Sequence, residues 1–315
     1  MEIASLLFGL LLILAGANYL TDGAAAVAQR FRISEFIIGL TIIAVGTSTP
    51  ELVVSVLSAI SGNSDIAIGN IVGSNIFNVF VILGVCALIA PLALTASNIR
   101  RDIPFGFAVS ILLLLITSDR LLHLGSIDKI GRIEGIIMVL IYIGLIGYTI
   151  HATKRNTPDT EGVKRPMAIW LSTLMIVGGL GALVVGGELF LRGATAIARA
   201  WGISESVIAI TLVAGGTSLP ELASSIVSLL KGKPEMALGN VVGSNIANIL
   251  LILGISATIH PLSMGGITLI DILMVVLSSL VLFIAAFTFR RRMIDRWEGI
   301  LFLLIYISYI WWLIQ

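Results

Sequence analysis

Ten long apolar segments account for most of this 315-residue sequence. A helix needs about 20 mostly apolar residues to cross a hydrocarbon layer about 30 Å thick. Hydrophobic residues make up 57% of the chain and charged residues 12%, which is more apolar surface than an aqueous core can bury. This composition excludes a soluble enzyme and a nucleic-acid-binding domain, and it predicts an all-α polytopic membrane protein that contacts the lipid bilayer. The segments are expected at about residues 3–29, 35–60, 67–90, 103–118, 133–151, 167–199, 203–230, 238–260, 267–289 and 297–314.

The basic residues are distributed unevenly between the loops that connect these segments. Of the 19 lysines and arginines, 14 lie in loops after odd-numbered segments and 5 lie in loops or segment ends after even-numbered ones. Because basic residues accumulate on the cytoplasmic side, the loops after odd-numbered segments are expected in the cytoplasm. Both termini are then extracellular, and we expect the protein in the cell membrane. The hydrophilic stretch 152–166 is interpreted as a cytoplasmic linker between residues 1–151 and residues 167–315.

Two motifs in the first half recur in the second half with a constant offset of 170 residues. The sequence GTSTPEL at 46–52 recurs as GTSLPEL at 216–222, and GNIVGSNIFN at 69–78 recurs as GNVVGSNIAN at 239–248. Each half is therefore a repeat of five segments. Since five is odd, the second half enters the membrane from the opposite side, and the repeats are inverted. Inverted repeats are typical of secondary transporters, whose binding site lies near the midplane where the repeats meet.

Each copy of the first motif places a glutamate, Glu51 or Glu221, deep in an apolar segment. An ionised side chain at this depth costs several kcal/mol unless it is paired or solvated, so both residues indicate a functional site. The proline before each glutamate has no N–H, so a broken helix is expected at both motifs. Residues four apart on a helix share a face, which adds polar neighbours. The stripes expected from this spacing are Thr47, Glu51 and Ser55; Asn70, Ser74 and Asn78; and their equivalents 170 residues later.

Every candidate ligand in these stripes is an oxygen atom of a carboxylate, amide, hydroxyl or carbonyl group. Oxygen-only coordination selects hard cations, and Ca²⁺ takes about six to eight oxygens in a flexible shell. Transition metals recruit His or Cys, but the three histidines lie toward loops and Cys86 stands alone in an apolar run. Two ionised glutamates neutralise one Ca²⁺ or two Na⁺, so these ions can compete for the same oxygens. Competition at one site, combined with alternating access, is sufficient for antiport.

At the doubled motifs the sequence resembles the sodium/calcium exchangers of the calcium/cation antiporter superfamily, in particular prokaryotic members without a regulatory domain. The resemblance covers essentially the whole chain. It implies a ten-helix fold of two inverted five-helix repeats in which Na⁺ entry drives Ca²⁺ extrusion. Both ions are then transported substrates, no organic cofactor is involved, the protein is not an enzyme, and we expect it to function as a monomer.

The resemblance also implies a set of metal ligands at the positions that match the family's motifs. The two glutamates would bridge the Ca²⁺ and Na⁺ sites, the asparagines would complete the central site, and the threonines, serines and alanine carbonyls would serve the Ca²⁺ site and the flanking Na⁺ sites. These residues are Glu51 and Glu221, Asn78 and Asn248, Thr47 and Thr217, Ser48, Ser218, Ser74 and Ser244, and Ala44 and Ala214.

Two departures separate this chain from other branches of the superfamily. Some relatives, including potassium-dependent exchangers, carry Asp where Asn248 stands, so we predict no K⁺ cotransport. The proton/calcium branch places a Glu in its G-N-x-x motif where Gly73 and Gly243 stand, which favours Na⁺ over H⁺ here. A Ca²⁺/H⁺ antiporter of the same fold is the alternative. No histidine shares the depth of Ser48 or Ser218, which disfavours an intramembrane hydrolase, and inverted repeats with broken helices disfavour a channel.

Overall fold

The computed structural model describes residues 2–118, 128–153, 167–202, 214–288 and 292–314. Most of the predicted linker, residues 154–166, and the first part of the seventh segment, residues 203–213, lie outside these ranges. The chain forms two compact units, and each is built from both halves of the sequence. Unit 1 comprises Met1–Ser48, Ile146–Gly243 and Tyr309–Gln315, and unit 2 comprises Thr49–Leu145 and Ser244–Ser308.

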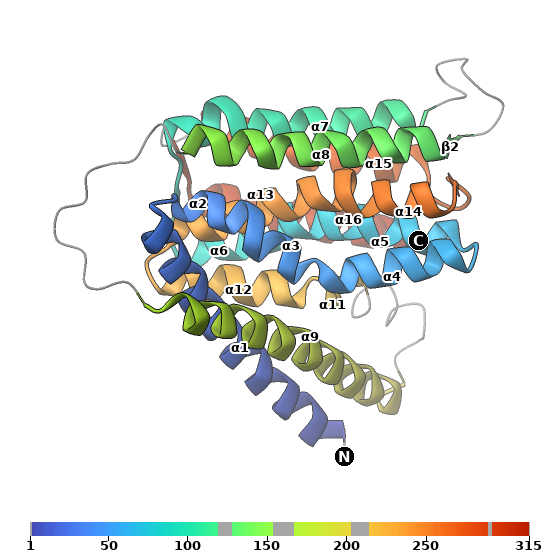
Figure 1. Ribbon diagram of the computed structural model, residues 1–315. Helices are drawn as coiled ribbons and strands as arrows, with labels where there is room; N and C mark the ends of the chain where they lie inside the picture. Colours follow the sequence, from blue (N-terminus) through green and yellow to red (C-terminus); the bar gives the residue numbers. More distant parts are fainter. Residues whose placement is uncertain (1, 119–127, 154–166, 203–213, 289–291, 315) are drawn as a thin grey trace. The chain divides into compact units, whose positions relative to one another are not determined.

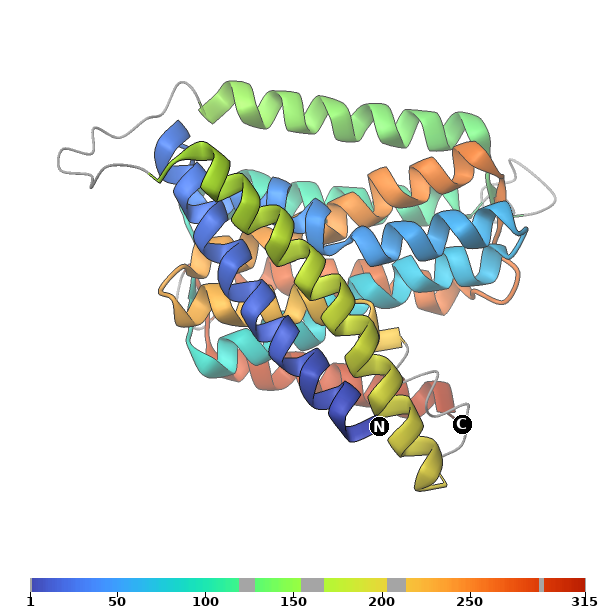
Figure 2. The same cartoon turned by 60° about the horizontal axis from the view of Figure 1, so that its bottom comes forward.

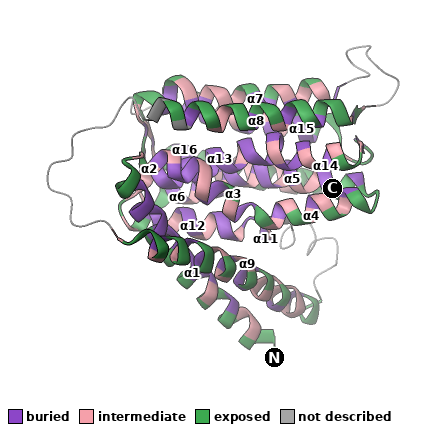
Figure 3. Ribbon diagram, in the orientation of Figure 1, coloured by how far each residue is buried: buried purple, intermediate pink, exposed green. Residues whose placement is uncertain are grey.

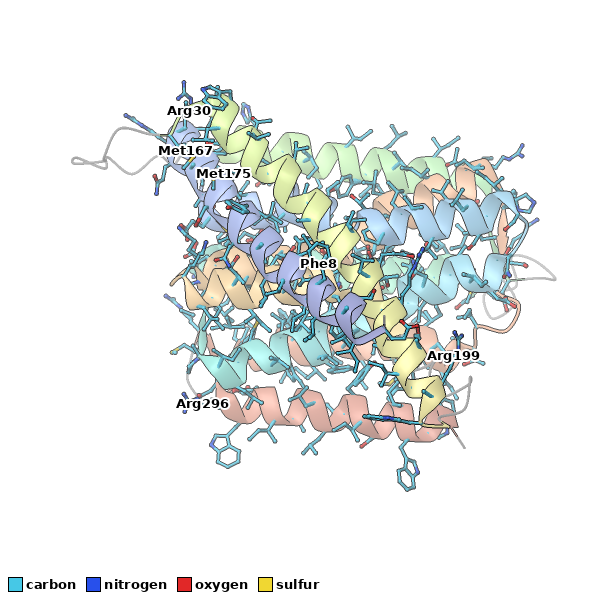
Figure 4. The ribbon with its side chains drawn as sticks, turned by 90° about the horizontal axis from the view of Figure 1, so that it is seen from below. Phe8, Arg30, Met167, Met175, Arg199 and Arg296 are labelled. Atoms are coloured by element: carbon cyan, nitrogen blue, oxygen red, sulfur yellow. The ribbon has the colours of Figure 1, made fainter. Side chains whose placement is uncertain are left out.

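Unit 1 contains the two longest described helices, α1 (Glu2–Phe31) and α9 (Ile169–Ala200), which run side by side in opposite directions (Figures 1 and 2). Arg30 at the end of α1 donates a hydrogen bond to the carbonyl of Met167, just before α9, over 3.5 Å (Figure 4). The remaining elements that lie in or begin in this unit are α2 (Glu35–Ile38), η1 (Gly39–Ile43), α3 (Ala44–Thr47), α11 (Ala214–Gly216), α12 (Leu219–Leu230) and α13 (Pro234–Ala247).

Glycines allow the backbones of α1 and α9 to approach closely. A Cβ atom added at Gly16 would lie 2.7 Å from the carbonyl oxygen of Gly179, and one added at Gly179 would lie 2.7 Å from the backbone nitrogen of Leu20. Gly16 and Gly186 are equivalent in the repeat, and Gly9 and Gly179 are too. Gly16 contacts Gly179 and Gly186 contacts Gly9, so exchanging equivalent residues converts one contact into the other, as expected for inverted repeats. The glycines in this contact are Gly9, Gly16, Gly23, Gly179, Gly186 and Gly193.

Unit 2 also joins elements from the two halves of the chain, here through its strands. The strand β1 (Leu92–Ala93) pairs antiparallel with β4 (Met293–Ile294), and β2 (Lys129–Ile130) pairs antiparallel with β3 (Leu262–Ser263). Each pair joins one strand from each half of the chain. The other elements, some of which extend beyond this unit, are α4 (Thr49–Ile60), α5 (Ser64–Phe77), η2 (Asn78–Leu83), α6 (Gly84–Ile89), η3 (Asn98–Asp102), α7 (Ile103–Ile116), α8 (Arg132–Thr153), η5 (Asn248–Leu253), α14 (Gly254–Ile259), α15 (Leu269–Ala285) and α16 (Arg296–Ile314).

The helices that carry the second motif are the most buried of the candidate membrane spans. In the runs Ser64–Ile89 and Pro234–Ile259 the most apolar stretch is 72% buried, against 28% in α1 and α9 and 22% in α8 (Figure 3). Within the described ranges, five helices are long and apolar enough to cross a membrane, or six if Glu35–Thr47 and Thr49–Ile60 form one span. The predicted segments 203–230 and 267–289 contain the shorter apolar helices α12 and α15.

Substitution of Gly179 tests the close packing of α1 and α9. We expect Gly179→Ala to destabilise the protein by about 1–3 kcal/mol, because its Cβ would meet fixed backbone atoms. Gly178→Ala is the matched control, since a Cβ there meets no atom within 4 Å in the described structure and alanine favours a helix interior by about 0.5–1 kcal/mol. Thermal unfolding of both variants in detergent measures the difference, and equal melting temperatures would contradict this packing.

Candidate functional site

Each copy of the first motif interrupts its helix at a serine. Ser48, between α3 and α4, has φ −78° and ψ 11°, and Ser218, before α12, has φ −88° and ψ 9°. These angles lie in the sparsely populated bridge region, where many functional residues sit. Pro50 and Pro220 fall in the first turn of the following helix, where an N–H has no partner within the helix in any case. The broken helices predicted from the prolines are confirmed.

The carboxylate of Glu221 in unit 1 is fully buried and contacts a residue from the other repeat. Ser48 Oγ donates a hydrogen bond to Glu221 Oε1 over 2.8 Å. Thr47, also fully buried, donates from Oγ1 to the carbonyl of Ile43 over 3.0 Å and to Asn240 Oδ1 over 3.3 Å. Unit 1 therefore brings together a carboxylate, two hydroxyls and an amide from both halves of the chain.

Asn240 links this carboxylate's helix to the second motif. Its Nδ2 donates to Ser224 Oγ and Ser225 Oγ, each over 2.9 Å, and to the carbonyl of Glu221 over 3.3 Å. These bonds tie α13 to the part of α12 that carries the glutamate. Asn240 was placed in a polar stripe by the sequence but not among the ligands, and the contacts show that it positions the backbone of Glu221.

Unit 2 repeats the asparagine contacts around Glu51, which is also fully buried. Ser74 Oγ donates to Glu51 Oε1 over 3.3 Å. Asn70 Nδ2 donates to the carbonyl of Glu51 over 3.3 Å and to Ser55 Oγ over 3.1 Å. Asn70 is equivalent to Asn240 in the repeat, so the same amide anchors the backbone of the glutamate in both halves.

Asn78 and Asn248 are the first residues of the π-helical segments η2 and η5, and each is 1% exposed. Such π-helical turns are rare and are often found at functional sites. The amide oxygens of both residues have no hydrogen-bond donor in the described part of the chain. A buried oxygen that accepts no hydrogen bond calls for a physical explanation, and a bound cation is one. Both oxygens are suitable ligands for a hard cation.

The predicted ligands thus fall into two groups, and only some of their contacts are described. As a binding set, all twelve remain a prediction. One expectation is wrong: Thr47 and Glu51 do not share a continuous helical stripe, because the helix breaks at Ser48 between them. The group in unit 1 is Ala44, Thr47, Ser48, Ala214, Thr217, Ser218 and Glu221, and the group in unit 2 is Glu51, Ser74, Asn78, Ser244 and Asn248.

Removal of the Asn240 amide tests its anchoring role. We expect Asn240→Ala to destabilise the protein by about 1–3 kcal/mol, because buried groups on α12 lose their donor. Asn18→Ala is the control, since that side chain is exposed and donates only to the carbonyl of Leu14 on its own helix among the described contacts. Denaturant or thermal unfolding in detergent compares them. An Asn240→Ala protein as stable as the control would exclude the anchoring role.

Comparison with known proteins places these features in context. The family model described as "Sodium/calcium exchanger protein" matches residues 1–151 and 171–315. The putative antiporter CaxA of Alkalimonas amylolytica is 35% identical over 312 residues, which cover 96% of this chain and 95% of that protein. The sodium/calcium exchanger MaX1 of Methanosarcina acetivorans is 32% identical over 340 residues, covering 97% and 96% respectively. A solved structure of the sodium-calcium exchanger NCX_Mj, soaked with 10 mM Na⁺ and zero Ca²⁺, matches with TM-score 0.83 and 33% identity, covering 98% of this chain and 97% of that one.

Proposed function

This chain belongs to the sodium/calcium exchanger family, and from that premise we propose that it exchanges Ca²⁺ for Na⁺ across the membrane by alternating access. The resemblance found in the doubled motifs is confirmed by the match. The predicted fold is confirmed with it: an all-α polytopic membrane protein with ten helices in two inverted five-helix repeats. Members of this family are transporters, so the chain is a cation antiporter and not an enzyme.

The proposal takes the oxygens of both groups as ligands of one site, in which Glu51 and Glu221 supply the charge. Its main support is that both carboxylates are fully buried at equivalent positions of the repeat. Removing an ionised carboxylate from water is expensive unless an opposite charge compensates it. The serine hydroxyls that contact Glu51 and Glu221 supply only partial positive charge. A bound cation would supply the balancing charge.

The number of charges explains how two different ions can use the same oxygens. Two ionised glutamates carry a total charge of −2, which one Ca²⁺ or two Na⁺ would neutralise. The amide oxygens of Asn78 and Asn248, together with the hydroxyls of Thr47 and Ser74, would add neutral ligands. Ca²⁺ accepts such a mixed and flexible oxygen shell. Because both ions would use the same oxygen ligands, binding of one would exclude binding of the other.

Replacement of the glutamates tests this site directly. Glu51→Gln and Glu221→Gln are each expected to reduce Na⁺-dependent ⁴⁵Ca²⁺ uptake into reconstituted vesicles to the level of vesicles without protein, since each removes one of the two charges. Glu188→Gln is the control, because Glu188 is exposed and pairs with Arg192 on its own helix over 2.7 Å. Full uptake by either site variant, with a normal melting temperature, would remove that glutamate from the site.

The coupling ion is tested by imposing gradients one at a time. We expect ⁴⁵Ca²⁺ uptake to follow an outward Na⁺ gradient and to be independent of K⁺, since Asn248 supplies a neutral amide and no third carboxylate. Uptake that follows a pH gradient without Na⁺ would favour the Ca²⁺/H⁺ alternative. Uptake without any counter-gradient would indicate a channel. Measurable stimulation by K⁺ would contradict the interpretation of Asn248.

The glycine-lined pair of α1 and α9 is the proposed moving part. Backbone contacts at glycines hold the two helices against each other, so they can move as a pair. Polar contacts join it to α12 and to the residue that follows α12. They are Thr21 Oγ1 to Ser228 Oγ at 3.2 Å and Lys231 Nζ to Asp22 Oδ1 at 2.6 Å. We propose that these two helices shift against the rest of the protein to expose the site to each side in turn.

The distribution of basic residues supports a location and an orientation for this function. The protein is proposed to lie in the cell membrane as a functional monomer, with both termini extracellular and the linker 152–166 in the cytoplasm. Na⁺ that enters down its gradient would then drive Ca²⁺ out of the cell. Because the chain carries its own doubled motif, no second subunit is needed to complete the ligand set.

A further inference from the structure

The second motif contains two asparagines three residues apart in each half of the chain. Asn78 and Asn248 are proposed ligands, whereas Asn75 and Asn245 have no assigned role. All four lie in unit 2. Asn75, Asn78 and Asn248 are buried, with exposed fractions of 0%, 1% and 1%. Since a buried amide must be satisfied at both its ends or be costly, the partners of these four side chains are informative.

One of these asparagines fixes the orientation of a proposed ligand. Asn78 Nδ2 donates a hydrogen bond to Asn245 Oδ1 over 3.0 Å, and Asn245 Nδ2 donates to the carbonyl of Asn75 over 3.4 Å. The amide of Asn245 is therefore held at both ends. Because Asn78 turns its nitrogen toward Asn245, its oxygen is directed away from that bond, and Asn78 Oδ1 accepts no hydrogen bond in the described structure.

The orientation of an asparagine amide decides whether it attracts or repels a cation. The oxygen carries negative partial charge and the NH₂ group carries positive partial charge, and the two ends are nearly equal in size. A rotation of the amide by half a turn would therefore replace a ligand by a repulsive group with little steric cost. A hydrogen bond to one end prevents this rotation.

The equivalent pair in the other half is present but not bonded. Asn248 corresponds to Asn78, and Asn75 corresponds to Asn245. Asn75 Nδ2 donates to the carbonyl of Ile71 over 2.8 Å, so its remaining polar atom is Oδ1. Within the described part of the chain, Asn75 Oδ1, Asn248 Nδ2 and Asn248 Oδ1 all lack a hydrogen-bond partner. Asn75 Oδ1 is thus an unused acceptor and Asn248 Nδ2 an unused donor among the described contacts. The equivalent acceptor and donor form the bond between Asn245 and Asn78.

We propose that Asn245 and Asn75 are positioning residues that turn the amide oxygens of Asn78 and Asn248 toward the transported cation. Asn245 does so through the bond that is present, and Asn75 does so through the equivalent bond from Asn248 Nδ2 when the ion is bound. This inference rests on the proposed exchange function and assigns a specificity role to two residues outside its ligand set.

Kinetics in two backgrounds distinguish a positioning role from a purely structural one. Asn245→Leu keeps a similar volume and removes the acceptor, so we expect the KM for Ca²⁺ in Na⁺-dependent uptake to rise roughly tenfold. In an Asn78→Asp background the same change should raise KM little or not at all, because the two oxygens of a carboxylate are equivalent and need no orientation. Asn75→Leu, measured with and without Asn248→Asp, should behave in the same way.

The outcomes separate failure of this inference from failure of the exchange function. If the unmodified protein shows no Na⁺-dependent Ca²⁺ uptake, the exchange function is wrong. If it does, and Asn245→Leu either leaves KM unchanged or raises it equally with and without Asn78→Asp, the positioning role is wrong. Should the leucine variant fail to fold, Asn245→Ala provides the same comparison. Uptake by the double variant would also show that a protein carrying the Asn245 substitution can fold.

Discussion

A carboxylate that is fully buried among apolar helices must be compensated by charge or hydrogen bonds, and this requirement organises the interior of the protein. Glu51 and Glu221 each accept a hydrogen bond from a serine, and each is held by an asparagine that binds its backbone carbonyl. The anchors fix where the charges lie, while the serines contribute only partial compensation. In the proposed site, a bound cation would add positive charge next to these anchored carboxylates.

The inverted repeat would give the proposed site equivalent access from the two sides of the membrane. The antiparallel contact between α1 and α9 and the strand pairs β1–β4 and β2–β3 each join one element from each half. In the proposed mechanism, the two access states would be built from equivalent contacts with the roles of the halves exchanged. Their free energies would then be close, which alternating access requires, because a ligand shifts an equilibrium only by its differential affinity for the two states.

The sequence was informative where physical constraints are local. Apolar segments, the constant offset of the motifs and the prolines before Glu51 and Glu221 predicted the helical fold, the repeat and the breaks at Ser48 and Ser218. The π-helical turns at Asn78 and Asn248 were not predictable, because an extra residue in a turn is stabilised by packing and leaves no local pattern. The expected stripe through Thr47 and Glu51 failed because it assumed a helix that continues past the break at Ser48. The anchoring amides emerged only from contacts between helices.

In the proposed site the neutral ligands accompany two carboxylates, and this has a consequence for ion selection. With a site charge of −2, one Ca²⁺ or two Na⁺ would complete neutrality, and any further Na⁺ would have to be held by oxygen dipoles alone. An amide dipole attracts a cation only when its oxygen faces the ion, whereas both oxygens of a carboxylate are negatively charged. The bond between Asn78 and Asn245 is made while its counterpart at Asn248 and Asn75 is open. In the proposed site, one amide would be oriented before the ion binds and the other would be ordered by the ion, so that ion binding would be coupled to a local change in the protein.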